Sequence, residues 1–401
     1  MKTTSVRAQP LAGLRILDLT RLLPGPVATM HLADFGADVI KVEDTGAGDY
    51  LRDFEPQVTN ARGERVNPAY EALNRGKRSI ALDLKQASGR EALLKLVDGA
   101  DALLESFRPG VLERLGLGWD VLHARNPRLV LCSITGYGAS GPLARAAGHD
   151  LNYAALAGVL DQNRAQGVPA VPNLQTGDVL GGALSALSTL LIALLAAQRK
   201  GLGRCVDVSM TDGLLMHHVF PHADLDAGVA PQAERTLLTG GVACYRVYQT
   251  ADRLYLAVGA LELKFWQTFC DAVGLPELKE RHWTLGEAPG SAAALESIER
   301  VGARLAERSR AEWEQVFAKV DACVTPVLSP AEALHHPQAV ARGLRHQMGE
   351  ATALGPLAQM SEHDFAVRPA PRAGEHTAEV LREVGYDTTA IDRLLAAGAA
   401  R

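Results

Sequence analysis

The sequence predicts an α/β protein whose open, mostly parallel sheet is covered by helices on both faces. From residue 14 to residue 210, apolar segments of strand length alternate with longer segments of helical periodicity, which is typical of βαβ units. Hydrophobic residues make up 47% of the chain and aromatic residues only 5%, which favours helix-rich α/β layers over a β-sandwich. A length of 401 residues exceeds what one core usually needs, so we expect two domains.

The elements of the first domain are expected to alternate along the chain. A buried strand at 14–20, a helix at 24–37 with proline at its start and a strand at 38–43 form one βαβ unit, so the two strands should be parallel. Thr211 is the expected cap of a later helix. Further strands are expected at 79–84, 101–106, 127–134 and 205–210, and further helices at 89–100 and 179–198.

The chain changes character after residue 224. We therefore expect a large domain at 1–224, completed by 331–401, and a small domain at 225–330. Ser309 is expected to cap a helix of the small domain. A hairpin, two helical segments and a strand are expected in this domain, at 243–261, 264–275, 291–319 and 322–328.

Composition argues against several classes of protein. A formal net charge of −5 disfavours a general nucleic-acid surface, although a local basic pocket for a phosphorylated ligand is compatible with it. The five cysteines lack metal-ligand spacing and are expected to be buried free thiols of a reducing cytosol. The N-terminal segment has no apolar signal core, so a cytoplasmic location is expected. The apolar run at 179–198 has the length of a membrane span, but we interpret it as a buried helix.

His149 and Asp150 stand out in a segment that otherwise consists mostly of alanine, leucine and glycine. A histidine among small apolar residues is usually packed in a core with its hydrogen bonds satisfied. Because Gly148 precedes it, however, a ligand can approach closely, and a neutral imidazole can take a proton near pH 7. Asp150 is expected either to orient that ring or to bond to backbone, and the sequence leaves both interpretations open.

Asp178 lies where a loop becomes the helix expected at 179–198. The ordinary interpretation is a helix N-cap, whose carboxylate accepts unpaired backbone N–H groups. The same position also suits chemistry, because Gly177 beside it permits close approach of a ligand and nearby free N–H groups can stabilise an oxyanion. Glu262 follows an apolar strand. It is expected to be a solvated strand end, a residue in the first turn of a helix, or a group that fixes the tautomer of His149.

Basic residues gather near predicted strand ends. Ligands of open α/β sheets bind outside the carboxyl ends of the strands, and lysine and arginine suit phosphates. The alternative is an ordinary solvated rim. A dinucleotide site is not expected, because the turn after the first strand is TRLLPGP rather than GxGxxG. The basic residues concerned are Arg75, Lys77, Arg78, Arg108 and Arg114.

Ordered motifs over nearly the whole chain resemble those of the family III CoA-transferases, also called the CaiB/BaiF family. They include LNRGKRSIALDLK, FRPGVLERLGLG, SITGYGASGP, GHDLNY, TGDVLGGALSAL and PRAGEHTAEVL. The resemblance implies a Rossmann-like large domain, a small α+β domain and an interlocked homodimer. It also implies that acyl-CoA binds at the large domain and that the partner's small domain closes the site. From the net charge and the segment pattern, we expect no nucleic-acid or membrane partner.

Two chemistries compete within this family. In the transferases, the aspartate that matches Asp178 is a nucleophile that passes CoA to a carboxylic acid through anhydride and thioester intermediates. In the α-methylacyl-CoA racemase branch, the same aspartate is an acid–base group, partnered by the histidine of GHDxNY and a glutamate of the small domain. Here GHDLNY supplies His149 and VGALELKF supplies Glu262, so the sequence is closest to the racemase branch. A non-catalytic acyl-CoA-binding protein is a third alternative.

The expected reaction is therefore racemisation at the α-carbon of 2-methylacyl-CoA thioesters. Inversion needs one base on each face, so that one group removes the α-proton and the other returns a proton to the resulting enolate. His149 and Asp178 are chemically suited to be this pair, with Glu262 orienting His149. This chemistry requires no metal or redox cofactor, and CoA enters as part of the substrate.

The resemblance also points to residues that would hold the substrate. Phe107 is expected to stack on adenine, and the cations are expected to meet phosphates. Many relatives have an arginine just after the second strand, where this chain has Asp44, so that contact is expected to be missing or supplied by Lys41 or Arg52. The substrate-binding residues expected are Leu23, Pro24, Asn74, Lys77, Ser106, Phe107, Arg108, Arg114, Gly148, Asp150, Tyr153, Gly177, Gly240 and Gly241.

Overall fold

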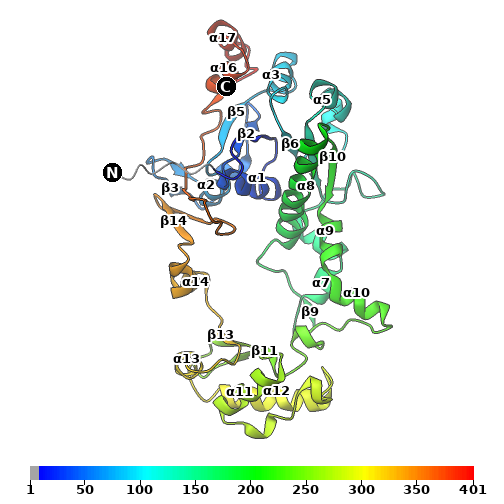
Figure 1. Cartoon of the computed structure of the whole chain (residues 1–401), viewed down its shortest axis with the longest axis vertical. Helices are drawn as coiled ribbons and strands as arrows, with labels where there is room; N and C mark the ends of the chain where they lie inside the picture. Colours follow the sequence, from blue (N-terminus) through cyan, green and yellow to red (C-terminus); the bar gives the residue numbers. More distant parts are fainter. Residues whose placement is uncertain (1–8) are drawn as a thin grey trace. The chain divides into compact units, whose positions relative to one another are not determined.

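The computed structural model describes residues 9–401, which divide into two compact units (Figure 1). The first unit holds the chain up to Ala157 together with Pro172–His217 and Gln338–Arg401, and the second holds Gly158–Val171 and His218–Pro337. The large domain expected at 1–224 included residues 158–171. This segment groups with the second unit, because the Glu234 carboxylate accepts the backbone N–H groups of Gln166 and Gly167 at 3.0 and 2.8 Å.

The first unit is built on a six-stranded sheet in which every pairing is parallel. The strand order is β10-β7-β6-β1-β2-β5, so the chain reverses its direction of growth across the sheet after β5. This arrangement confirms the predicted parallel α/β sheet. The strands are β1 (Arg15–Asp18), β2 (Asp38–Glu43), β5 (Arg78–Ala81), β6 (Ala102–Glu105), β7 (Val130–Thr135) and β10 (Cys205–Ser209).

Helices cover both faces of this sheet, as predicted. Successive strand residues point to opposite faces, so Ile16 packs with one helix layer and Leu17 with the other. Each such buried aliphatic side chain stabilises the fold by about 1.5–3 kcal/mol. One layer consists of α1 (Pro24–Asp34) and α8 (Ser185–Lys200), and the other of α3 (Ala87–Val97), α5 (Trp119–Arg125), α16 (Thr377–Glu383) and α17 (Thr388–Ala396).

The turn from β1 into α1 is tight enough to require glycine. Pro24 begins the helix, where its fixed φ and missing N–H are tolerated. A Cβ on Gly25 would lie 2.1 Å from Thr20 Oγ1, so only glycine lets the helix start so close to the end of β1. The backbone of α1 is thereby held directly against the carboxyl edge of the sheet.

The apolar helix expected at 179–198 starts earlier and is less buried than predicted. It opens with a π-helical segment, Gly177–Leu184, and continues as α8. One side packs on the sheet as expected of a buried helix, while Ile192 on another side is 68% exposed, so the helix is buried only in part. By length and composition, the combined helix Gly177–Lys200 is apolar enough to cross a membrane.

Thr211 does not cap the next helix, α9 (Met210–His217). Its hydroxyl donates to the Gly136 carbonyl at 2.7 Å, and the Ser209 hydroxyl accepts the Asp212 N–H instead. With Thr211 as its cap, the helix would begin at residue 212. It begins at Met210 instead, and the hydroxyl of the strand residue Ser209 performs the capping.

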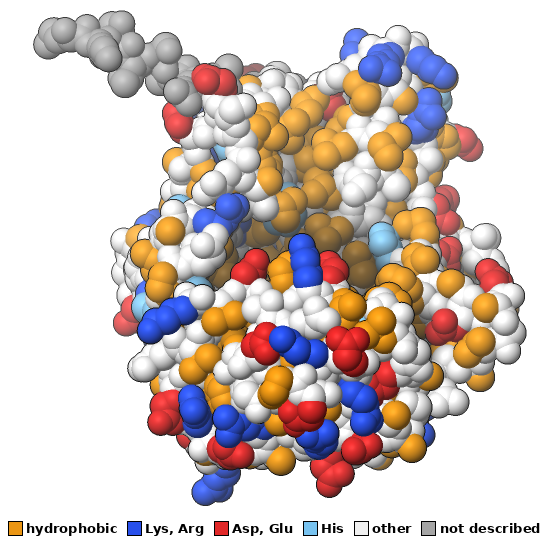
Figure 2. Space-filling view, turned by 60° about the horizontal axis from the view of Figure 1, so that its bottom comes forward, with side chains coloured by type: hydrophobic (Ala, Val, Ile, Leu, Met, Phe, Trp, Pro, Cys, Tyr) orange, Lys and Arg blue, Asp and Glu red, His pale blue; other side chains and the backbone are white. Residues whose placement is uncertain are grey.

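The second unit is a small antiparallel sheet with helices. The expected hairpin and strand are confirmed as β11 (Tyr245–Gln249), β12 (Tyr255–Gly259) and β13 (Val324–Pro326). Trp266, Phe269 and Trp313 are fully buried in its core. Figure 2 turns this unit forward and shows positive and negative side chains interspersed on that face. Its helices include α10 (Val219–Asp226), α11 (Leu263–Val273), α12 (Ala292–Leu305), α13 (Arg310–Phe317, capped by Ser309 as predicted) and α14 (Pro330–His335).

All five cysteines are free, as predicted. The prediction that they are buried holds for Cys132, Cys244 and Cys270, whereas Cys205 and Cys323 are exposed.

Candidate active site

A pocket of about 520 Å³ opens in the first unit at the carboxyl ends of four strands. The loops that follow β1, β6, β7 and β10 all contribute to its wall, which is where ligands of open α/β sheets bind. His149 and Asp178, 29 positions apart in the sequence, line this same pocket. Its other lining residues include Arg21, Pro24, Tyr50, Ser106, Phe107, Arg108, Tyr137, Gly148, Asn152 and Tyr153.

His149 immediately precedes helix α6 (Asp150–Leu156). Its backbone N–H donates to Asn152 Oδ1 at 3.0 Å, which fixes the chain at the start of the helix. The residue is exposed, so the interpretation as a packed core histidine is wrong. The residue lines the pocket and is exposed, so its imidazole is accessible for proton transfer.

Asp178 is the second residue of the π-helical segment, and Thr176 precedes that segment. The expected N-cap role is therefore wrong. Its own backbone N–H donates to Asp150 Oδ1 at 2.9 Å, so Asp150 bonds to backbone rather than acting on the His149 ring. Burial and, to a smaller extent, the negative Asp150 raise the pKa of Asp178 to about 6, while His149 opposes the shift. A carboxyl group with this pKa can exchange a proton near neutral pH.

Two glycines let the backbone pass close to the pocket-lining side chains. A Cβ on Gly148 would lie 2.7 Å from both Tyr137 Oη and Tyr153 Cε1, and a Cβ on Gly177 would lie 2.9 Å from Asp150 Oδ1. The Tyr153 hydroxyl donates to the Gly148 carbonyl at 2.5 Å. Burial, together with the Asp178 carboxylate, raises the pKa of Tyr153 to about 12, so this donor stays protonated.

The loop after β6 carries three of the expected substrate-binding residues, Ser106, Phe107 and Arg108. The Phe107 N–H donates to Glu105 Oε2 at 2.6 Å, which anchors the loop to the buried end of the strand. Burial raises the pKa of Glu105 to about 7. Arg108 is exposed and makes no ion pair within residues 9–401, so its charge is available to a ligand.

A second pocket, of about 700 Å³, lies beside the first at the carboxyl ends of β1, β2 and β5. Arg21 and Phe107 line both pockets, so the two adjoin at these side chains. The expected residues Leu23 and Arg114 line neither pocket, although the neighbouring Pro24 lines the first. The second pocket is otherwise lined by Leu19, Thr20, Val42–Gly46, Gly48, Asp49, Leu82–Lys85, Val111 and Leu115.

Asn74 and Lys77 are interior residues that reach neither of these pockets. Lys77 Nζ donates to Asp18 Oδ2 at 3.1 Å, to Pro26 O at 3.2 Å and to Asn74 Oδ1 at 2.9 Å. These contacts use all three donors of the ammonium group. Burial lowers the pKa of Lys77 to about 8, although Asp18 opposes this shift. The expected phosphate contact of Lys77 therefore has no support in the structure.

Arg75 and Arg78 are also ion-paired at the opposite end of the strand from the pockets. They lie just before and at the start of β5, because strand polarity puts residues 75–78 at its amino end. Arg75 pairs with Asp34 at 2.5 Å, and Arg78 pairs with Asp38 at 2.7 Å and with two glutamates of α16. The interpretation of these arginines as a phosphate rim is wrong.

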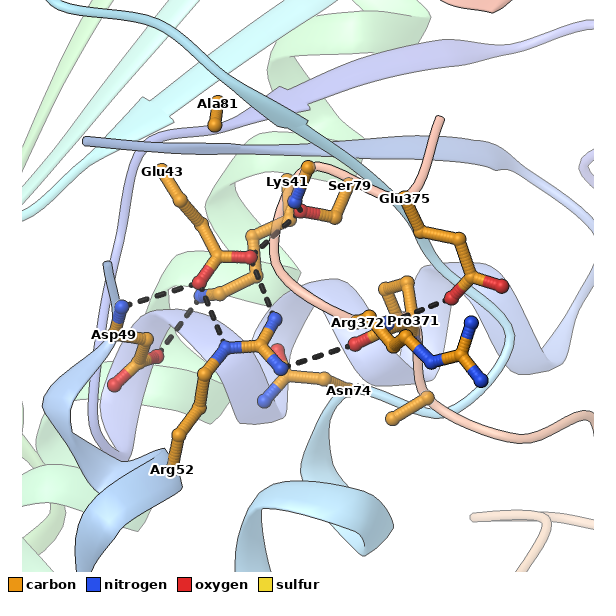
Figure 3. A network of polar contacts seen from close by, with 12 residues as sticks. Lys41, Glu43, Asp49, Arg52, Asn74, Ser79, Ala81, Pro371, Arg372 and Glu375 are labelled. Carbon is orange, nitrogen blue, oxygen red and sulfur yellow. Dashed lines mark hydrogen bonds and ion pairs between the residues drawn. The ribbon is translucent and has the colours of Figure 1, made fainter. Parts of the chain in front are cut away.

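Lys41 and Arg52 do not replace the arginine that Asp44 displaces. Figure 3 shows both in a network centred on Glu43: Arg52 Nη2 lies 2.6 Å from Glu43 Oε1, and Lys41 Nζ lies 3.0 Å from Asp49 Oδ2. The buried Lys41 and Asp49 are both under 2% exposed. Because each cation is already neutralised by a carboxylate, neither is free for a phosphate.

Three expected site residues belong to the second unit. Glu262 is exposed and occupies the position just before α11, with no side-chain capping bond. Gly240 has φ of +93° and lines a pocket of about 560 Å³ within that unit. A Cβ on Gly241 would lie 2.2 Å from the Arg235 carbonyl, so glycine is required there.

Sequence reasoning missed Arg21, Tyr137 and Lys85. Each follows the carboxyl end of a strand, which is the signal that could have found them. Within residues 9–401 there is no group of three or more His, Cys, Asp or Glu residues arranged to hold a metal ion.

Comparison with known proteins places this geometry in a family. The model of CoA-transferase family III matches residues 11–377. The chain belongs to CoA-transferase family III. It is 37% identical to the α-methylacyl-CoA racemase of Mus musculus, with 96% of each chain covered.

Other members of CoA-transferase family III are nearly as similar. The succinyl-CoA:glutarate CoA-transferase of Mus musculus is 31% identical, with 97% of this chain and 90% of that protein covered. The crystal structure of a CaiB/BaiF family protein from Brucella suis superposes with a TM-score of 0.81 at 29% identity, covering 94% of this chain and all of that one. The family thus includes proteins named for both chemistries.

Proposed function

We propose that this family III protein is an acyl-CoA isomerase that racemises the α-carbon of 2-methylacyl-CoA thioesters. The observation that carries the proposal is that a solvent-accessible imidazole, His149, and a carboxyl group with a pKa of about 6, Asp178, line one pocket. Two groups able to exchange protons near neutral pH are what 1,1-proton transfer requires.

The proposed reaction has two balanced steps. One group of the pair takes the α-proton, and the electron pair of the C–H bond moves to the thioester oxygen as an enolate. The other group, already protonated, then gives its proton to the opposite face of the α-carbon. Because the roles of His149 and Asp178 exchange with the direction of the reaction, either enantiomer serves as substrate.

The enolate oxygen needs hydrogen-bond donors. The N–H of Asp178 is already engaged with Asp150, so it does not serve this purpose. We infer that the first turn of α6 supplies the donors, since the N–H groups of Asp150 and Leu151 carry no hydrogen bond within the described chain. These N–H groups directly follow His149, and both His149 and Asn152 line the pocket.

We propose that the CoA moiety extends from the first pocket into the second. Phe107 lines both, and its ring offers a stacking surface for adenine. Arg21 and Arg108 are exposed cations suited to phosphates. The pantetheine arm would run from this junction along the first pocket and present the thioester to His149 and Asp178.

Two further parts of the proposal come from the family resemblance. Glu262 would orient the imidazole of His149, and two copies of the chain would form an interlocked homodimer. The exposed apolar side of α8, which includes Ile192 at 68% exposure, supports an association that covers it.

A CoA-transferase is the second candidate, favoured by the similarity to named transferases at 31–33% identity. In that reaction the Asp178 carboxylate attacks the thioester carbonyl and CoA leaves as a thiolate. The CoA thiolate then attacks the aspartyl carbonyl of the resulting anhydride, which releases the first carboxylate and leaves an aspartyl-CoA thioester. The acceptor carboxylate displaces CoA from this thioester to form a second anhydride. The thiolate attacks the acceptor acyl carbonyl of that anhydride, which yields the new acyl-CoA and frees the Asp178 carboxylate. His149 has no proton-transfer role in this scheme.

A single incubation in D₂O tests the proposal. The enzyme receives (R)-2-methylacyl-CoA with or without a free carboxylic acid, and mass spectrometry and chiral chromatography follow the products. Racemisation predicts one deuterium at the α-carbon together with loss of chirality, whether or not the acid is present. Transfer of CoA to the acid without α-exchange would refute the isomerase and support the transferase.

A further inference from the structure

A short C-terminal segment, residues 399–401, pairs with residues 81–83, two of which line the second pocket. The Asp83 N–H donates to Ala399 O at 2.9 Å, the Arg401 N–H donates to Ala81 O at 3.2 Å, and Ala400 forms an antiparallel bridge with Leu82. Ala399 and Ala400 are buried. The segment therefore continues the sheet beside β5, next to the pocket-lining residues Leu82–Lys85.

The backbone of Arg401 is fixed by hydrogen bonds, and its exposed guanidinium makes one hydrogen bond, to a backbone carbonyl of a pocket-lining residue. The Thr377 hydroxyl donates to Arg401 O at 2.5 Å, which holds the residue against α16. Arg401 Nη1 donates to Gly46 O at 3.2 Å, and Gly46 lines the pocket. The guanidinium is exposed and forms no ion pair with a carboxylate among residues 9–401, so its charge at the pocket rim is not neutralised.

The pocket itself lacks an excess of positive charge. Its buried acids are already neutralised, Glu43 by Arg52 and Asp49 by Lys41. At the surface of the pocket, the two positive charges of Arg21 and Lys85 are matched in number by the two negative charges of Asp44 and Asp83.

These two acids are themselves used in turns. Asp44 accepts the Gly46 N–H at 2.8 Å, and Asp83 accepts the Lys85 N–H at 3.0 Å. Neither forms an ion pair with a cation of the pocket among the described residues. A dianionic phosphate in this pocket thus needs a further cation, and Arg401 is the cation that the fold brings to the rim.

We propose that Arg401 binds the 3′-phosphate of the CoA moiety. This inference rests on the proposed function, since it assumes a CoA thioester as ligand. With the thioester at His149 and the adenine on Phe107, the phosphorylated ribose at the far end of CoA lies toward the β2 and β5 loops, where Gly46 and Lys85 are. A planar guanidinium has several N–H donors and binds phosphate oxygens in a bidentate manner. Such binding does not require Arg401 to keep its hydrogen bond to the Gly46 carbonyl.

The test measures binding of CoA and of 3′-dephospho-CoA by isothermal titration calorimetry. For R401A we expect CoA to bind about ten-fold more weakly, a loss of about 1.4 kcal/mol, with 3′-dephospho-CoA bound as by the wild type. R401K, which keeps the charge but not the planar fork, should lie between the two. R393A is the matched control, because it removes an exposed arginine of α17 near the same end of the chain, and it should bind both ligands normally.

Each alternative outcome overturns the assignment. Equal weakening of both ligands by R401A would place the arginine on the diphosphate, and unchanged binding of CoA would remove it from the site. Thermal melting of R401A shows whether the Ala399–Arg401 pairing survives. If it does not, R401K, which keeps the side-chain stem, decides by the same ratio of CoA to 3′-dephospho-CoA affinity.

The test also separates this inference from the proposed function. If the wild type binds CoA and exchanges the α-proton while R401A keeps the wild-type affinity ratio, only the phosphate assignment fails. If the wild type does not bind CoA at all, both fail.

Discussion

The Asp150 carboxylate accepts a hydrogen bond of 2.9 Å from the backbone N–H of Asp178. This contact joins the start of α6 to the π-helical segment and places a negative charge beside the Asp178 carboxyl. Gly177 makes the contact compatible with packing, since a Cβ there would lie 2.9 Å from Asp150 Oδ1. The bond therefore both positions Asp178 and helps to hold its pKa above the ordinary value.

The first prediction concerns pH dependence. For the enantiomer whose α-proton Asp178 takes, Asp178 must be ionised, so kcat/KM for α-proton exchange should fall on the acid side with an apparent pKa near 6. In D150N the amide oxygen still accepts the Asp178 N–H, but the negative charge is gone, so the pKa of Asp178 falls and the acid limb moves to lower pH. A pH–rate profile measures the shift. An unmoved acid limb would show that Asp150 does not set this pKa.

The second prediction separates the two candidate bases. H149A should lower the rate of racemisation by about 10²–10⁴-fold, the usual contribution of a general acid–base group. Any transferase activity should survive, because that reaction does not use the imidazole. D178A should abolish both activities. Wild-type α-exchange by H149A in D₂O is the result that rules out the two-base assignment.

The third prediction concerns the packing of the pocket wall. In G148A the new Cβ would lie 2.7 Å from Tyr137 Oη and Tyr153 Cε1, so the rings must move. We expect a loss of about 1–3 kcal/mol in the free energy of unfolding and a large fall in kcat. G99A is the matched control, because no atom lies within 4 Å of a Cβ built there. Chemical denaturation compares them, and equal stability of the two variants would contradict the close packing at Gly148.

The fourth prediction distinguishes a structural lysine from a ligand-binding one. K77M leaves the Asp18 carboxylate buried without its cation, which should destabilise the fold by about 3–5 kcal/mol. The exposed Lys85 provides the control, since K85M should leave the unfolding free energy nearly unchanged. Denaturant titration gives both values. A stable K77M with weakened CoA binding would instead restore the phosphate-binding role expected from the sequence.

The order of strands and helices could be predicted because it depends on local patterns. Period-2 and period-3.6 hydrophobicity located β1, α1 and β2 to within a few residues, and the βαβ order implied their parallel pairing. His149 and Asp178 were found as candidates from residue type and neighbouring glycines. That they line one pocket was not readable, since 29 positions separate them and only the packing of α6 on the π-helical segment brings them to the same wall.

The errors share one physical cause. Proximity to a strand in the sequence does not reveal at which end a charged side chain lies or what neutralises it. Arg75, Lys77 and Arg78 were expected at a phosphate rim, but they lie at the amino end of β5 and pair with Asp34, Asp18 and Asp38 from other strands or helices.

The sequence by itself determined the fold class, the family resemblance and the residue types able to move a proton. Only the tertiary structure decided which charges are free. Whether a carboxylate or a cation has a functional or a structural role depends on the partner that folding places beside it. Asp150 beside Asp178 and Arg401 beside Gly46 are examples. Such partners lie far apart in the chain, so local pattern carries no record of them.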